Sequence, residues 1–218
     1  MRQFSNVIKK GLSILMISAI IHGVILAFGL ILPLGVQNVF VFNQGATQPK
    51  FNRTIPVIIT ASLCDTFLIT LAVFGVSVIV LSISWFKIVL LTVGILFLAY
   101  MGYVTWNSNP STNSNNQKAL APKKQIAFSL SVSLLNPHAI MDTIGVIGTS
   151  SLSYTGLDKI GFTLACILIS WIWFFSLALA GRLVGKLPNS AGYIVMLNKV
   201  SAIIIWGTAL YLIFTFLD

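Results

Sequence analysis

Acidic residues are almost absent from this chain of 218 residues, and charge of either sign is scarce. Only four residues are acidic, all of them aspartates, and charged residues make up 8% of the chain, against roughly 25% in soluble domains. Hydrophobic residues make up 57%, and the mean hydropathy is +0.97. This composition excludes a water-soluble globule.

The chain also lacks the motifs of enzymes and metal proteins. Its two cysteines, Cys64 and Cys166, lie inside apolar runs without CxxC or zinc-ligand spacing, so we expect them to be packing residues. A nucleophile triad, a Walker loop and a dinucleotide fingerprint are all missing. We therefore expect no enzyme, no metal and no bound cofactor. The excess of 13 basic over four acidic residues bears on membrane orientation rather than on nucleic-acid binding.

Long apolar runs occupy most of the chain. They lie at 12–42, 55–81, 85–106, 126–148, 160–181 and 193–217. A run of about 20 apolar residues is long enough to cross a bilayer, and these six leave no room for a soluble domain. The sequence predicts an all-α integral membrane protein with about six transmembrane helices.

Prolines interrupt the first and fourth runs, at Pro33 and at Pro137. Shifting the first half by 104 positions places Pro33 on Pro137 and the second run on the fifth. The one long polar connection, 107–125, separates a repeat at 1–106 from a repeat at 126–218. With three crossings in each half, we predict a 3+3 inverted repeat that binds substrate near mid-membrane. The alternative is coincidence, because proline is common in membrane helices.

Basic residues predict the orientation. The connections after the first, third and fifth runs carry Lys50, Arg53, Lys118, Lys123, Lys124, Arg182, Lys186 and Lys199. The other connections carry only Lys87 and Lys159, so the first set is expected to be cytoplasmic. Both ends of the chain would then face outward, in conflict with the basic N-terminal residues Arg2, Lys9 and Lys10. A start at Met16 or an odd number of spans would remove the conflict.

Two aspartates lie where a lipid-facing helix would not tolerate them. Asp65 is about ten residues into the second run, and Asp142 is in the middle of the fourth. A charge at the bilayer centre costs about 2.5–3.5 kcal/mol, and no interior Lys or Arg is available to pair with either carboxylate. The missing partner is then a cation that arrives from outside, either substrate or proton. Alternatively, each aspartate is protonated and bonded to a neighbouring Ser, Thr or Asn.

Further polar residues cluster at the two interruptions. Backbone amide and carbonyl groups that lose their helical hydrogen bonds there could also bind a ligand. They are Gln37, Asn38, Asn43 and Gln44 after Pro33 and Gly35, and Asn136 and His138 beside Pro137. Asn38 and Asn136 could equally satisfy the broken backbone. His138 lies four residues before Asp142, on the same helix face, where it could relay protons or act only as a structural hydrogen bonder.

The two interrupted segments, together with the aspartates and amides described above, resemble the lysine/arginine exporter (LysE/ArgO) family. The resemblance runs from about Met16 to the C-terminus and rests on ILPLGVQNVFVFNQG, an Asp in the second run, LNPHAIMDTIGVIG and SWIWFFSLALAG. Val36 stands where relatives commonly have a second proline. The resemblance implies a multi-pass exporter of L-lysine or L-arginine in the bacterial inner membrane, driven by protons or the membrane potential and without a cofactor.

The family pattern is matched residue by residue at Pro33, Gly35, Gln37, Asn38, Asn43, Gln44, Asp65, Asn136, Pro137, His138, Asp142 and Thr143. We hypothesise that Asp65 and Asp142 hold the side-chain cation of the substrate, and that the amides hold its carboxylate. Protonation of Asp65 or Asp142, with His138 as a relay, would couple export to inward proton flow.

Other functions remain open at the level of sequence. A neutral amino acid such as threonine or homoserine would not need two carboxylates, whereas a divalent metal could be ligated by Asp65, Asp142 and His138. An intramembrane aspartic protease would need a G-x-G-D setting that neither Asp has, and a purely structural subunit would need no unpaired carboxylates. Gly94, Gly102 and Gly207 permit close helix contact, within the chain or in a homodimer.

Overall fold

The structure is a computed structural model that describes residues 2–32, 35–75, 84–107, 120–188 and 190–217. Its elements are all helical in these ranges, as predicted. The long helices are α1 (Arg2–Ile31), α3 (Ile55–Val73), α5 (Ser84–Trp106), α8 (Gly156–Gly185) and α9 (Ser190–Leu217). Shorter elements are α2 (Val36–Thr47), η1 (Phe51–Thr54), α6 (Pro122–Leu134), α7 (Pro137–Asp142), η2 (Thr143–Gly148) and η3 (Ser151–Ser153).

Three helical segments are long and apolar enough to cross a membrane by themselves: Phe51–Val73, Gly156–Gly185 and Ala191–Leu210. Two bent pairs each make one further span, so the described residues hold up to five. The third predicted run, 85–106, corresponds to α5, which contains a shorter apolar helix, Ile95–Trp106, in the described part. The chain is therefore a multi-pass membrane protein.

Both predicted interruptions are present as sharp bends. The axis turns by 80° between α1 and α2 and by 60° between α6 and the helix that follows Asn136. Pro33 itself lies outside the described residues. Pro137 begins α7, where its missing amide hydrogen costs no helical hydrogen bond, although its side chain and that of His138 lie outside the described part.

Two boundaries differ from the expected ones. Helix α3 ends at Val73, within the run 55–81, because Gly75 adopts a φ of +91°, which favours glycine and ends the helix; residues 76–81 of the run lie outside the described part. At the other boundary, α6 begins at Pro122, inside the segment 107–125 that the sequence suggests as a linker. Pro122 takes the first-turn position, so the helix includes Lys123, Lys124 and Gln125.

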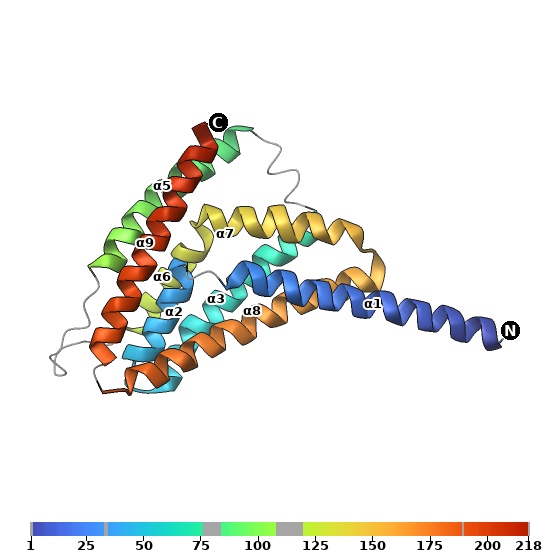
Figure 1. The fold of residues 1–218 in the computed structure, drawn as a ribbon, viewed down its shortest axis with the longest axis horizontal. Coiled ribbons are helices and arrows are strands. Elements are labelled where there is room, and N and C mark those ends of the chain that lie inside the picture. Colours follow the sequence, from blue (N-terminus) through green and yellow to red (C-terminus); the bar gives the residue numbers. More distant parts are fainter. Residues whose placement is uncertain (1, 33–34, 76–83, 108–119, 189, 218) are drawn as a thin grey trace.

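Several contacts between helices join segments that lie about 105 residues apart in the chain. Helix α3 crosses α8 so that Asp65 contacts Ser170 and Thr66 contacts Trp171, in both cases at a separation of 105 residues. Likewise α5 packs along α9, and the two lie side by side in Figure 1. When the halves of a chain are related by a two-fold axis, residues on that axis contact their own counterparts. The separation of 105 is one residue from the offset of 104 seen in the sequence.

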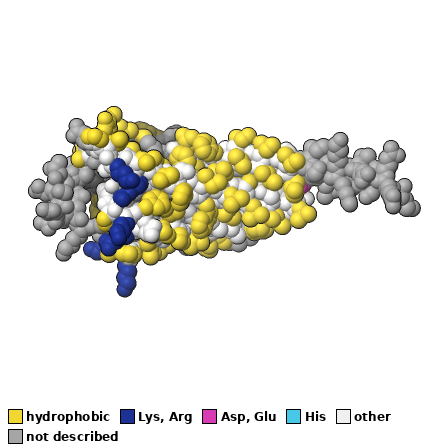
Figure 2. Space-filling view, turned by 90° about the horizontal axis from the view of Figure 1, so that it is seen from below, with side chains coloured by type: hydrophobic (Ala, Val, Ile, Leu, Met, Phe, Trp, Pro, Cys, Tyr) yellow, Lys and Arg dark blue, Asp and Glu magenta, His cyan; other side chains and the backbone are white. Residues whose placement is uncertain are grey.

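Basic side chains gather at one end of an otherwise largely apolar surface (Figure 2). Hydrogen bonds join the segments that meet there. Arg182 near the end of α8 donates to the carbonyl oxygens of Gln48 and Pro49, and Gln125 donates to that of Arg53. The positive-inside rule predicts that this end faces the cytoplasm.

Candidate functional site

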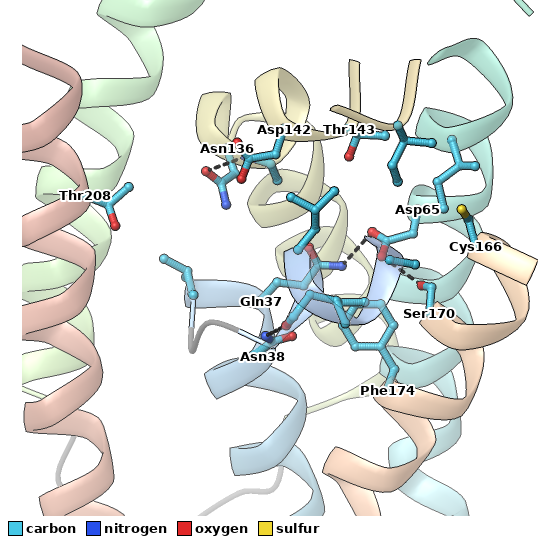
Figure 3. A pocket seen from close by; sticks show the side chains of 18 of the residues that line it. Gln37, Asn38, Asp65, Asn136, Asp142, Thr143, Cys166, Ser170, Phe174 and Thr208 are labelled. Carbon is cyan, nitrogen blue, oxygen red and sulfur yellow. Dashed lines mark hydrogen bonds between the residues drawn. The ribbon is translucent and has the colours of Figure 1, made fainter. Parts of the chain in front are cut away.

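A pocket of about 140 Å³ lies where the bent segments meet α3 and α8. Its polar lining comes from the N-terminal end of α2, from the middle of α3 and α8, from α7 and the residues on either side of it, and from α9 (Figure 3). The polar side chains that line it are Gln37, Asn38, Asp65, Asn136, Asp142, Thr143, Ser170 and Thr208. None of the described lining residues is Lys, Arg or His.

Asp65 is held by two neutral donors. The Ser170 hydroxyl donates to Oδ2 at 2.8 Å, and Gln37 Nε2 donates to Oδ1 at 3.4 Å. Both bonds use the carboxylate as an acceptor, which is the role of its ionised form. The two donors come from α8 and α2, so three helices converge on this one carboxylate.

Asp142 ends α7 and lines the same pocket, half-buried. The next residues, Thr143–Gly148, form a π-helical stretch instead of continuing the α-helix. Such stretches occur often at functional sites because they alter the direction of side chains along a helix. Thr143 and Ile147 of this stretch also line the pocket.

The two asparagines hold the interrupted backbone together. Asn38 Nδ2 donates to the carbonyl oxygen of Ile31 at 2.7 Å, across the first break, and Asn38 Oδ1 accepts from Trp173. Asn136 is the N-cap of α7, and its side chain accepts from the amide of Ala139. Both side chains therefore bond to backbone groups at the helix breaks, which is one of the two roles considered from the sequence. Both residues also line the pocket.

The structure does not bring Asn43 and Gln44 to the pocket. They lie six and seven residues after Gln37, about 10 Å further along α2. Asn43 Nδ2 donates to Asn198 of α9 at 2.7 Å, and Gln44 accepts from Gln48 Nε2 at 2.9 Å. Asn43 and Gln44 are expected from the sequence to contact substrate, but in the structure their side chains bond to Asn198 and Gln48, away from the pocket and toward the basic end.

Sequence reasoning missed several lining residues. Cys166, Ser170 and Phe174 are spaced by four along α8 and share one buried face of that helix. This spacing of a small and a polar residue inside an apolar run is the signal that could have found them. Thr208 of α9 carries no comparable signal.

Metal-ligand clusters are missing from the described part of the chain, where no three His, Cys, Asp or Glu side chains gather. The hypothetical divalent-metal site would need His138, whose side chain is outside that part. The cysteines are free and buried. Close helix contact at Gly102 is made within the chain, against Trp206 of α9.

Comparison with known proteins agrees with this architecture. Residues 28–215 match the family model described as LysE type translocator. A Bacillus subtilis protein, YisU, named as a candidate amino-acid transporter, is 59% identical over 194 residues, which are 89% of this chain and 88% of the relative. The arginine exporter ArgO of Pectobacterium carotovorum is 31% identical over 90% of this chain and 97% of its own.

The ArgO protein of Escherichia coli K12 is also 31% identical, over 90% of this chain and 94% of its own. No solved structure matches the chain significantly. The family match covers both bends, both aspartates and all the described pocket residues except Ala27. The chain therefore belongs to the LysE family of translocators, and it is a transporter rather than an enzyme.

Proposed function

We propose that this protein exports basic L-amino acids, arginine or lysine, from the cytoplasm across the bacterial inner membrane. One observation carries the proposal. Asp65 and Asp142 line the same pocket, and no Lys, Arg or His is among the described residues lining it. Two carboxylates in such a site favour a cationic cargo. The names of the ArgO relatives support the same substrate class.

The first helical turn after the α1–α2 break suits the carboxylate of the substrate. Gly35 caps α2 without a side-chain hydrogen bond, and Gly35, Val36, Gln37 and Asn38 all line the pocket. The first amides of a helix have no partner within it and carry the positive end of the helix dipole. An amino acid could thus place its carboxylate at α2 and its side-chain cation at the aspartates.

The guanidinium group of arginine can form two parallel hydrogen bonds with a carboxylate, whereas the lysine ammonium acts as a point charge. Asp65 accepts two hydrogen bonds in the structure, and a carboxylate has about four acceptor positions. Acceptor capacity therefore remains for the cargo.

Proton coupling completes the proposal. A proton that reaches Asp65 or Asp142 from outside neutralises the carboxylate, removes its attraction for the cation and releases the cargo. Return of the proton to the cytoplasm resets the site, so inward proton flow drives export. His138 is the third group proposed in this relay.

The test is counterflow of radiolabelled arginine and lysine in proteoliposomes with an imposed pH gradient. We expect Asp65→Asn and Asp142→Asn each to reduce exchange by more than about 30-fold, because each removes a charge partner of a buried cation. Both variants should still insert and elute as monodisperse protein.

Asp158→Asn is the matched control, because Asp158 lies in the first turn of α8 and does not line the pocket. It should retain exchange. Undiminished arginine and lysine exchange in both pocket variants would refute the proposal. Exchange of threonine or homoserine alone would favour the neutral-cargo alternative, and cadmium transport would favour the metal alternative.

A further inference from the structure

Buried polar side chains follow one face of α6 from the basic end to the pocket. Gln125, Ser129 and Ser133 are spaced by four residues, and Asn136 at the pocket follows three residues later. This spacing keeps the first three on one face of α6, and Asn136 follows just after that helix ends at Leu134. The first three are at most 1% exposed. A helix that only packs against its neighbours would bury apolar residues there.

A second polar face follows α2 between the same two places. Gln37, Gln44 and Gln48 are spaced by seven and four residues, and all three are buried. Gln37 is at the pocket, bonded to Asp65, while Gln48 is at the basic end. Helix α2 contacts α6 through the rings of Phe40 and Phe128, whose centroids are 4.2 Å apart.

The two polar faces meet at one carbonyl group. Gln48 Nε2 donates to the carbonyl oxygen of Leu120 at 3.1 Å, and Gln125 Nε2 donates to the same oxygen at 2.8 Å. Each amide also has a second acceptor, Gln44 Oε1 for Gln48 and the carbonyl oxygen of Arg53 for Gln125. These bonds join α2, the start of α6 and the η1 segment at the basic end.

Several polar atoms along these faces have no hydrogen-bond partner in this conformation. They are Oε1 of Gln48, Oε1 of Gln125 and the hydroxyl oxygens of Ser62, Ser129 and Ser133. Ser62 belongs to α3, which packs directly against α6. Native proteins bury few polar atoms in this way, so a concentration of them indicates that they have partners in another state.

We propose that Gln44, Gln48, Ser62, Gln125, Ser129 and Ser133 form the closed cytoplasmic entry path to the pocket, with Gln48 and Gln125 as its seal. When α6 moves away from α2, the unpartnered oxygens face water and the incoming cargo. Neutral amides and hydroxyls suit a zwitterion with a cationic side chain, because they can solvate it without binding it as tightly as a carboxylate. This inference takes one element from the proposed function, namely that the cargo enters the path from the cytoplasm.

Single cysteines test the path. Ser129→Cys and Ser133→Cys are made in a chain carrying Cys64→Ala and Cys166→Ala, and Ser131→Cys is the control, because Ser131 is exposed on another face of α6. Inside-out and right-side-out vesicles are treated with a membrane-impermeant methanethiosulfonate that carries a quaternary ammonium. The readout is the labelling rate, so it does not depend on how fast the altered chain transports.

We expect residues 129 and 133 to be labelled from the cytoplasmic side at least about tenfold faster than residue 131, and arginine on that side to slow the reaction. Adding Gln48→Ala and Gln125→Ala should raise the labelling rate, because the seal is lost. Absence of cytoplasmic labelling at both positions, or labelling only from the opposite side, overturns the path whatever the transport assay shows. Cytoplasmic labelling without arginine exchange supports the path and refutes the proposed cargo.

Discussion

At the scale of single residues, Asp65 is the point where the two halves of the chain meet. Its donors come from α2 in the first half and from α8 in the second. Movement of α3 relative to α2 or α8 would therefore change the number of hydrogen bonds to this carboxylate. A proton or a cation bound at Asp65 would act on the same contacts.

Ser170→Ala tests this role. Loss of the hydroxyl removes the 2.8 Å hydrogen bond to Asp65 Oδ2. A hydrogen bond to a charged group contributes roughly 1.5–3 kcal/mol, so we expect arginine exchange at subsaturating concentration to change by about tenfold or more. The control is Ser176→Ala on the same helix, at an exposed position away from the pocket. Equal exchange by the two variants would contradict a role for Ser170 at the carboxylate.

The sequence alone indicated Asp65, Asp142, Gln37 and Asn136, because a carboxylate or amide inside an apolar run has few structural explanations. Ser170 and Thr208 could not be found in this way. Hydroxyl groups in membrane helices commonly bond to a carbonyl four residues earlier, as Thr66 and Thr70 do here. Residue type therefore carries no signal for either side chain. Ser170 is marked in the sequence only by its four-residue spacing from Cys166 and Phe174, and Thr208 is placed only by the packing of α9.

At the scale of elements, helices α2 and α8 pack with their backbones in close contact. A methyl group at Gly181 would overlap the carbonyl oxygen of Phe42, one at Gly45 would overlap that of Ala178, and one at Gly185 would overlap that of Ala46. Arg182 adds two hydrogen bonds to the carbonyl groups that follow α2. Small residues that let backbones approach are typical of tightly associated membrane helices.

Gly181→Ala should therefore force α2 and α8 apart. Overpacking at a backbone contact costs about 1–3 kcal/mol, which corresponds to a fall in Tm of roughly 2–10 °C for a chain of this size. Thermal unfolding of the purified protein in detergent measures the effect. Gly192→Ala on α9 is the matched control, since nothing lies within 4 Å of the added methyl group. Identical Tm values for both variants would show that the contact is not tight.

Element boundaries were less predictable than element positions. Both bends could be placed from their prolines, but the start of α6 at Pro122 could not be separated from the polar segment before it. Gln125 looks like a linker residue because its neighbours are Lys123 and Lys124, yet it is fully buried. Burial of a polar side chain depends on partners distant in the chain, in this case the carbonyl of Arg53 and the helix α2.

At the scale of the whole molecule, helix α8 is long enough to connect the two membrane surfaces by itself. Its 30 residues span about 45 Å, more than the roughly 30 Å of a bilayer core. Lys159 is in its first turn, over the ring of Phe74, and Lys186 follows its last residue at the basic end. The predicted orientation places Lys159 outside the cell and Lys186 inside.

Cysteines at these two positions test the orientation. In whole cells, an impermeant thiol reagent should label Lys159→Cys and spare Lys186→Cys, and permeabilised cells should show labelling of both. The pair is matched, because both residues flank the same helix at its ends. The reverse pattern in intact cells would invert the orientation and place the polar path between α2 and α6 on the outer side.

The glycine contacts between α2 and α8 have a mechanical consequence. Two helices in backbone contact cannot slide past each other without leaving a gap that no side chain fills, so they are expected to travel as a single rigid body. Between α6 and α2, the described residues show instead one tilted ring pair, Phe40 with Phe128, and the glutamine bonds to Leu120. Opening toward the cytoplasm would then be a hinged swing of α6, pivoting at the Asn136 cap.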